Sequence, residues 1–455
     1  MFKKRLMVMV FLACILVATC SAEPKSAQLR FCWWGNDQRT QLTLKVIDMY
    51  MKKHPNVKIE AEYNGKSDQA KIATQLISGT VADIIQLNPP WMVDMTSNGD
   101  FFVNFKAKKR FIDLSGFDPK FLRDYGTFNG KLIGLPTGLN AIALLMNQTV
   151  AKDFNIPTSM STKWTWNDLD NVGKAVNKKD SSKYFLNSDS RTLGTFILRP
   201  YIKQRTGQQI IKDNYTLGFT RQNLIDALTY IDKLYKDKVL QPAQEANVFA
   251  DVPTTNPKWS NGSLVAEFMW TSQFDGAAKD AKGEMGTFIF PMEAHSKDTG
   301  LTVQPAQLLG VSNKSKNIDE AVKFVNYFLN DVEAGKVLKD TRSIPPVKKV
   351  RETCTSAGLL SKNVVDGVNY GLAHMGKPDN GPSSNVQVEK IFTDAIEKIG
   401  FGSPVNQVAD ETIKLLNAQL TTLKTTRDKY KSRNGIANIL GSVTGPLVPK
   451  QADRR

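Results

Sequence analysis

The sequence predicts an α/β fold on three observations near its N-terminus. Residues 29–33 form a short strand-like run, residues 57–63 alternate between apolar and polar side chains, and residues 82–87 form another apolar run. The segments between these runs have the spacing of amphipathic helices. Strands that alternate with helices in this way pair into a parallel or mostly parallel sheet with helices over its faces.

The two connecting segments are predicted to be helices. Asn36 and Asp37 offer N-caps for a helix that reaches about His54, where Pro55 stops it, and a second helix spans residues 66–78. Ligands of such sheets bind beyond the carboxyl ends of the strands. The residues at those ends are rich in rings and amides: Trp33, Trp34, Tyr63, Gln86, Asn88 and Trp91.

The remainder of the chain is more helical. Expected helices open at residue 165 and span 221–236 and 318–330, and expected strands span 263–269 and 308–312. The last strong helical patterns lie at 386–399 and 404–423. From residue 425 to 455 the apolar periodicity fades into a basic tail, for which we expect disorder or, alternatively, a contact with a partner or the cell envelope.

The N-terminus has the features of a secretory signal over residues 1–20. A basic head precedes an apolar run that is too short for a membrane span. Residues 16–20 resemble a bacterial lipobox, in which Cys20 is acylated and anchors the protein to the membrane, although Thr19 departs from the usual small residue. The alternative is cleavage after Ala22, which leaves a free protein.

Composition excludes several classes of site. After signal removal only Cys32 and Cys354 remain, so we expect neither a disulfide scaffold nor a cysteine metal site. The three histidines are isolated, no metalloprotease or hydrolase motif occurs, and no cofactor is expected. The formal net charge of +16 is scattered without a nucleic-acid motif, so it favours an anionic ligand or an acidic envelope over nucleic acid.

One stretch carries the strongest family signal. Residues 129–137 read Asn-Gly-Lys-Leu-Ile-Gly-Leu-Pro-Thr and are followed by Leu-Leu-Met-Asn at 144–147. Further pieces follow in a matching order at 33–35, 164–166, 262–270, 309–321 and 342–345. Together they resemble the extracellular solute-binding proteins of the maltose-binding superfamily. Met146 and Ser343 depart from the Tyr and Gly that the family usually has.

The resemblance implies a two-lobed periplasmic-binding-protein fold of type II, with three chain crossings and closure over a ligand. Residues 28–138 plus 291–342 would form the first lobe, and 139–290 plus 343–424 the second. The crossings are expected at 136–140, 288–292 and 342–347, where Gly and Pro cluster.

The resemblance also implies a sugar ligand, which needs aromatic platforms and hydrogen-bonding groups. By family position Trp270 is the expected platform, or else a core residue. Arg342 could hold a carboxylate or tie the hinge together, and Asn36 and Asp37 could reach ligand or only cap their helix. The expected ligand-binding set is Trp33, Trp34, Asn36, Asp37, Asn88, Trp91, Asn140, Trp270 and Arg342.

The implied function is that of a substrate-binding receptor of an ABC importer. It would act outside the cytoplasm, as a monomer, with a permease and an ATPase as partners, since the chain has no phosphate-binding loop. Two alternatives stay open: an extracellular carbohydrate-active hydrolase, and a carbohydrate-binding surface protein without a transport role.

Overall fold

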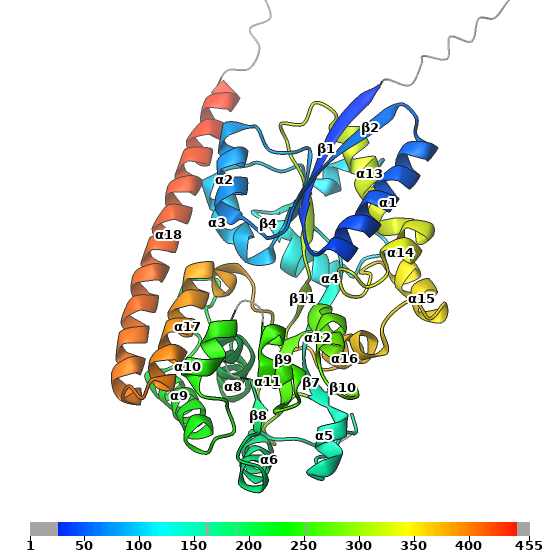
Figure 1. The fold of residues 1–455 in the computed structure, drawn as a ribbon. Helices are drawn as coiled ribbons and strands as arrows, with labels where there is room; N and C mark the ends of the chain where they lie inside the picture. The colour runs from blue at the N-terminus through cyan, green and yellow to red at the C-terminus, as the bar shows by residue number, and fades with distance from the viewer. Residues whose placement is uncertain (1–25, 161–162, 188, 251–252, 444–455) are drawn as a thin grey trace, which may run out of the picture.

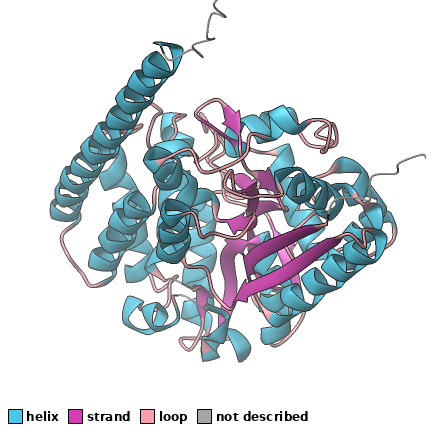
Figure 2. Ribbon diagram, turned by 90° about the horizontal axis from the view of Figure 1, so that it is seen from above, coloured by secondary structure: helices cyan, strands magenta, loops and turns pink. Residues whose placement is uncertain are grey.

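The computed structural model describes residues 26–160, 163–187, 189–250 and 253–443, which form two lobes, each built on its own sheet (Figure 1). The first lobe has the strand order β2-β1-β3-β12-β6, and the second β10-β7-β9-β8 with β11 paired to β7. Seen from above, the strands lie in the middle of the molecule with helices around them (Figure 2). The expected α/β class and two-lobed fold are confirmed.

The strands of the first sheet are β1 (Ala27–Trp34), β2 (Val57–Asn64), β3 (Ile84–Leu87), β6 (Leu135–Pro136) and β12 (Leu308–Val311). β1 pairs in parallel with β2 and β3, as the sequence predicts. β12 is antiparallel to both β3 and β6. The helices of the first lobe are α1 (Asp37–Lys53), α2 (Gln69–Ser78), α3 (Met92–Asn98), α13 (Ile318–Asn330), α14 (Val332–Leu338) and α15 (Lys348–Ser356).

The strands of the second sheet are β7 (Leu139–Asn147), β8 (Tyr184–Leu186), β9 (Leu264–Trp270), β10 (Met285–Phe288) and β11 (Val303–Pro305). Its main helices are α5 (Gln148–Asp153), α6 (Trp166–Lys179), α7 (Ser190–Leu193), α8 (Arg199–Thr206), α9 (Arg221–Lys236), α12 (Phe274–Asp280), α16 (Lys362–Ala373), α17 (Val386–Gly400) and α18 (Val405–Val443). A single π-helical turn, η4 (Gly194–Leu198), joins α7 to α8. Shorter elements are α4 (Pro119–Phe121), α10 (Ala243–Ala246), α11 (Pro257–Ser260), β4 (Thr127–Phe128) and β5 (Lys131–Leu132).

Local capping explains where several helices begin. The side chain of Asn36 accepts a hydrogen bond of 2.9 Å from the backbone N–H of Arg39, so it caps α1. Thr165 and Asp168 form a capping box at the start of α6, and Thr220 and Asn223 form one at α9. These caps satisfy backbone donors that a helix cannot pair internally.

Two segments carry the chain between the sheets. The first lies between β6 and β7, inside the expected segment 136–140. The second lies at residues 306–307, between β11 and β12. The sequence places this passage earlier, at 288–292, but β11 still pairs with β7 and therefore belongs to the second lobe.

The segment 342–347, the expected third crossing, lies against the first passage. Leu139 forms a β-bridge with Ile344, and a Cβ on Gly138 would stand 1.7 Å from the carbonyl oxygen of Arg342, so only glycine fits there. The chain then stays in the first lobe, where α15 packs on α14, and reaches the second lobe with α16, which packs on β7. Packing thus places residues 348–356 in the first lobe, not in the second as expected.

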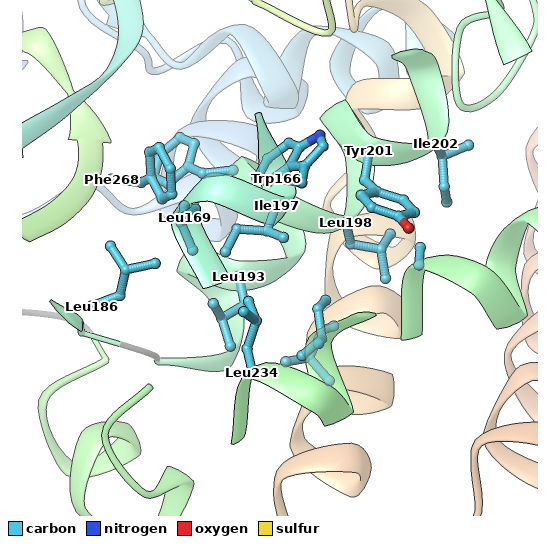
Figure 3. Packing of buried hydrophobic residues seen from close by; sticks show 14 of the residues in the cluster. Trp166, Leu169, Leu186, Leu193, Ile197, Leu198, Tyr201, Ile202, Leu234 and Phe268 are labelled. Carbon is cyan, nitrogen blue, oxygen red and sulfur yellow. The ribbon is translucent and has the colours of Figure 1, made fainter. Parts of the chain in front are cut away.

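Each lobe has its own apolar core. In the first, Phe31 packs against Phe324 and Phe328 of α13 and against the neighbouring ring of Trp33. The larger core of the second lobe gathers side chains from α6, α7, η4, α8 and α9 (Figure 3). Leu193, Ile197 and Leu198 face this core, which leaves the opposite side of the α7–η4–α8 segment turned away from it.

Helix α18 lies along one side of both lobes (Figure 1). It packs on α9 and α17 of the second lobe and reaches α3 of the first, with Leu416, Leu420 and Leu423 buried. The expected disorder after residue 425 is wrong up to Val443, because helix α18 continues to that point. Residues 444–455, like the proposed signal, lie outside the described residues.

Cys32 and Cys354 are free thiols, and both are buried. Among the helices that the structure describes, none is both long enough and apolar enough to cross a membrane.

Candidate ligand-binding site

A cavity of about 330 Å³ lies between the two lobes. The first lobe contributes Asn88 and Pro90, which follow β3, and the second lobe contributes most of the remaining wall. The second-lobe wall comes from the start of β7, the end of β9, and the α7–η4–α8 segment. The main polar and aromatic groups around it are Asn88, Asn140, Arg191, Thr192, Phe196, Arg199, Glu267, Trp270, Gln304, Gln307, Asp379, Ser384 and Glu389.

Trp270 supplies the aromatic wall of the cavity. It closes strand β9 and is half-buried, packed against the core of the second lobe. Phe196 of η4 stands edge-on to it, with ring centroids 5.4 Å apart and planes at 79°. This T-shaped contact fixes the orientation of the indole, and a fixed, partly accessible ring can stack on the apolar face of a sugar.

Asn140 places an amide beside this ring. Its Oδ1 accepts hydrogen bonds from Oγ1 of Thr271 at 3.1 Å and from the backbone N–H of Ser272 at 2.9 Å. Both bonds use the amide oxygen, so the orientation of the amide is set and Nδ2 remains as its donor. The half-buried Asn88 contributes a second amide, from the first lobe.

Two of the acidic side chains at the cavity have cationic partners. Glu389 of α17 accepts from Nε of Arg191 at 2.6 Å. Asp379 lies 3.8 Å from Nζ of Lys203, an ammonium whose side chain is 0% exposed, and it also accepts from the hydroxyl of Ser383 at 2.9 Å. Within each pair, the positive and the negative charge offset each other.

The third acidic side chain, Glu267, is 0% exposed and has no cationic partner among the described residues. Its Oε1 accepts from Nδ2 of Asn187 at 3.2 Å, while its Oε2 has no hydrogen-bond partner there. Burial, and then the nearby Asp189, raises the pKa of Glu267 to about 8, against the opposing effect of the Asn187 bond. Glu267 is therefore protonated at neutral pH and can act as a hydrogen-bond donor.

Arg199 is the remaining charged side chain among the described residues that line the cavity. It is 6% exposed, donates one hydrogen bond of 2.8 Å from Nη1 to the carbonyl oxygen of Ser383, and stacks over the ring of Phe392 at 5.4 Å. Arg199 follows Phe196 by three positions, so both side chains project from one side of the chain, toward the cavity.

Three residues of the expected ligand-binding set, Asn88, Asn140 and Trp270, line this cavity together. Asn36 caps α1, and Asp37 lies exposed in the first turn of that helix. Trp34 and Trp91 pack against each other with ring centroids 5.0 Å apart and planes tilted by 37°, and neither is among the lining residues. Trp33 is 0% exposed in the first-lobe core, so it cannot reach a ligand in this conformation.

Arg342 also lies away from the cavity. Its Nη2 donates to Oγ1 of Thr43 at 2.9 Å, its Nε donates to Oε1 of Gln86 at 3.3 Å, and its guanidinium stacks over Phe328 at 5.3 Å. Complete burial lowers its pKa well below the usual range of an arginine. These contacts fit the second reading of Arg342, a tie between the hinge and α1 and β3.

The sequence patterns do not predict the wall formed by Arg191, Phe196, Arg199 and Glu267. The spacing of Phe196 and Arg199 by one helical turn is the signal that could have grouped them. Gly194 and Pro200 interrupt that pattern, and Glu267 is hidden in a strand whose other residues are apolar.

Comparisons with known proteins agree with this architecture. The model of a family described as bacterial extracellular solute-binding protein matches residues 45–362. The multiple sugar-binding protein of Streptococcus mutans is 25% identical over 365 residues, which cover 75% of this chain and 82% of the relative.

Two solved structures are similar over nearly their whole length. A periplasmic solute-binding protein from Pectobacterium atrosepticum superposes with a TM-score of 0.80 at 23% identity, covering 87% of this chain and 99% of that one, which supports the fold. A periplasmic oligogalacturonide-binding protein from Yersinia enterocolitica, solved with saturated digalacturonic acid, superposes with a TM-score of 0.76 at 25% identity, covering 88% and 100%.

Proposed function

Since the chain belongs to the bacterial extracellular solute-binding proteins, we propose that it is the receptor of an ABC importer for an oligosaccharide or sugar derivative. The ligand would bind in the cavity between the lobes, and the closed receptor would deliver it to a membrane permease. Lobe closure of this kind is a hinge motion around a small number of residues that connect the lobes.

The observation that carries the proposal is the position of Trp270 on the cavity wall beside Asn140, with Asn88 on the opposing lobe. A partly exposed aromatic ring and amides from both lobes suit a ligand with apolar C–H faces and hydroxyl rims. The sugar ligands of the Streptococcus and Yersinia relatives support the same class of ligand.

The proposed partners are two permease subunits and an ATPase, since the chain has no phosphate-binding loop with which to drive transport itself. We also propose that acylated Cys20 anchors a monomeric receptor to the extracytoplasmic face of the membrane. Several acyl chains hold a protein durably, because each buried methylene contributes about 0.8 kcal/mol. The intact mass of the mature protein tests this: a mature chain without a diacylglyceryl group on Cys20 contradicts the anchor.

The test of the function is a screen of glycans by thermal unfolding, followed by calorimetry and by chromatography of the incubated glycan. A receptor binds without turnover, and at a ligand concentration 100 times Kd it gains about 2.7 kcal/mol of stability. Cleavage of the glycan would instead indicate a hydrolase. Binding without turnover in a protein whose deletion leaves uptake of that glycan unchanged would indicate a non-transport surface protein.

A further inference from the structure

The charges around the interlobe cavity do not cancel. Arg191 pairs with Glu389, and Asp379 lies against the ammonium of Lys203. Glu267 carries no charge at neutral pH, because burial raises its pKa to about 8. Among the residues that the structure describes, these pairings account for every charged side chain on the wall except one.

The exception is Arg199. Its guanidinium makes one hydrogen bond, to a neutral carbonyl oxygen, and within the described part of the chain no carboxylate lies within ion-pair distance of it. The side chain is 94% buried, as its exposed fraction of 6% implies. A buried cation without a counter-ion is costly, so its presence at the edge of a cavity indicates that an anion completes the site.

The surroundings of Arg199 identify the chemistry of that anion. An arginine fork binds carboxylate groups through paired N–H donors. Phe196, one turn before Arg199, contacts Trp270. Arg199 and Trp270 therefore lie on either side of Phe196 on the cavity wall. A sugar ring stacked on Trp270 would therefore have a substituent within the neighbourhood of the guanidinium.

We infer that the ligand is an acidic sugar, an oligosaccharide containing uronic acid, whose carboxylate binds Arg199 in the interlobe cavity. This inference rests on the proposed sugar-receptor function and narrows it. Glu267, whose Oε2 has no hydrogen-bond partner among the described residues, offers a neutral donor on the same wall. A neutral acid tolerates an anionic ligand, whereas an ionised one would repel it.

The wild-type protein tests the inference directly, with matched ligand pairs. Short oligogalacturonates, oligoglucuronates and oligomannuronates are compared by calorimetry with their carboxyl-reduced counterparts, which have the same linkage and stereochemistry but a hydroxymethyl group instead of the carboxylate. We expect at least one acidic member to bind about 10- to 100-fold more tightly than its reduced counterpart, the range for a hydrogen bond to a charged group.

Variants assign the effect to Arg199. Arg199→Gln retains a donor for the carbonyl oxygen of Ser383 but removes the charge, so it should abolish the preference for the acidic member. Arg199→Lys keeps the charge without the fork and should retain part of the preference. Arg221→Gln is the control, since Arg221 pairs with Asp410 on the exposed surface between α9 and α18.

The outcomes separate the two levels of the proposal. Equal binding of acidic and reduced members overturns the carboxylate inference and leaves the sugar receptor standing. An undiminished preference in Arg199→Gln, or its loss in Arg191→Gln instead, overturns the assignment to Arg199. Binding of no glycan at all, acidic or neutral, overturns the receptor function together with the inference. If Arg199→Gln does not fold, as judged by its thermal transition, the comparison of acidic and reduced ligands on the wild-type protein still tests whether the ligand is acidic, and Arg199→Lys tests the role of Arg199.

Discussion

The Nδ2 of Asn385 donates a hydrogen bond of 2.9 Å to Oδ1 of Asp94, and this bond joins the two lobes. Asp94 lies on α3 of the first lobe, and Asn385 is the N-cap of α17 in the second, where its Oδ1 accepts from the backbone N–H groups of Gln387 and Val388. One amide therefore serves both the helix start and the contact between the lobes.

This arrangement predicts that Asn385→Asp weakens ligand binding by about tenfold at pH 7, or about 1.4 kcal/mol. The cap survives, because Asp and Asn cap equally well, but two carboxylates then face each other across the lobes. Burial raises the pKa of Asp94, so mild acid should protonate this pair and restore affinity. Calorimetry at pH 7 and pH 5 checks both points. Asn385→Ser, which keeps a cap without adding charge, is the control, and an unchanged Kd in Asn385→Asp would contradict the role of the contact.

Trp270→Ala should weaken sugar binding by about 1–3 kcal/mol while the protein still folds, since it removes the aromatic wall of the cavity. Trp34→Ala is the matched comparison: Trp34 is also a half-buried tryptophan at a strand end, but it packs against Trp91 and is absent from the cavity lining. We expect its effect on Kd to be small. Equal losses of sugar affinity in the two variants would show that Trp270 has no specific role in binding.

The raised pKa of Glu267 predicts that the stability of the protein depends on pH. This pKa is raised from 4.5 in a model peptide to about 8 in the folded protein, so the folded state keeps a proton that the unfolded chain releases. The stabilising contribution is complete below pH 4.5 and disappears as the pH rises to 8, at about 1.4 kcal/mol of unfolding free energy per pH unit between those values.

Glu267→Gln should therefore gain stability relative to wild type by about 2 kcal/mol between pH 6 and pH 8. Denaturant unfolding at the two pH values measures this difference. Glu284→Gln, at an exposed carboxyl, should show no comparable gain. A difference between Glu267→Gln and wild type that stays constant with pH would show that Glu267 ionises normally.

Arg342→Lys should destabilise the protein by about 2–4 kcal/mol and leave sugar affinity nearly unchanged once the variant is folded. Lysine is a point donor and cannot serve Thr43 and Gln86 together as the arginine fork does. Thermal unfolding and calorimetry separate the two effects. A large loss of sugar affinity with normal stability would instead show that Arg342 binds the ligand.

Much of the first lobe could be predicted from the sequence, because its elements are local patterns. Asn36 and Pro55 bracket α1, and the alternation at residues 57–63 corresponds to β2. The side chains of Trp33 and Trp34 point to opposite faces of β1, as strand geometry requires. What the pattern cannot tell is that the outward face of Trp34 is covered by Trp91, a residue more than fifty positions away.

The binding wall of the second lobe was less predictable for a physical reason. Arg199 looks like an ordinary surface cation in the sequence, and its burial depends on Phe392 and Ser383 from a distant part of the chain. The same holds for α18, which packs on α9 and α17 of the second lobe and reaches α3 of the first. Tertiary contacts of this kind override local propensity.

The burial of Cys32 and Cys354 makes the protein suitable for conversion into an optical reporter. In a chain produced without residues 1–22 these are the only thiols, and burial raises the pKa of each, which keeps both as unreactive thiols. Maleimide dyes would therefore label only cysteines introduced at exposed positions. Ile77 on α2 and Phe401 after α17 are two exposed positions, one on each lobe. A donor and an acceptor fluorophore placed there would report lobe closure as a change in energy transfer, so that sugar in solution could be detected by fluorescence.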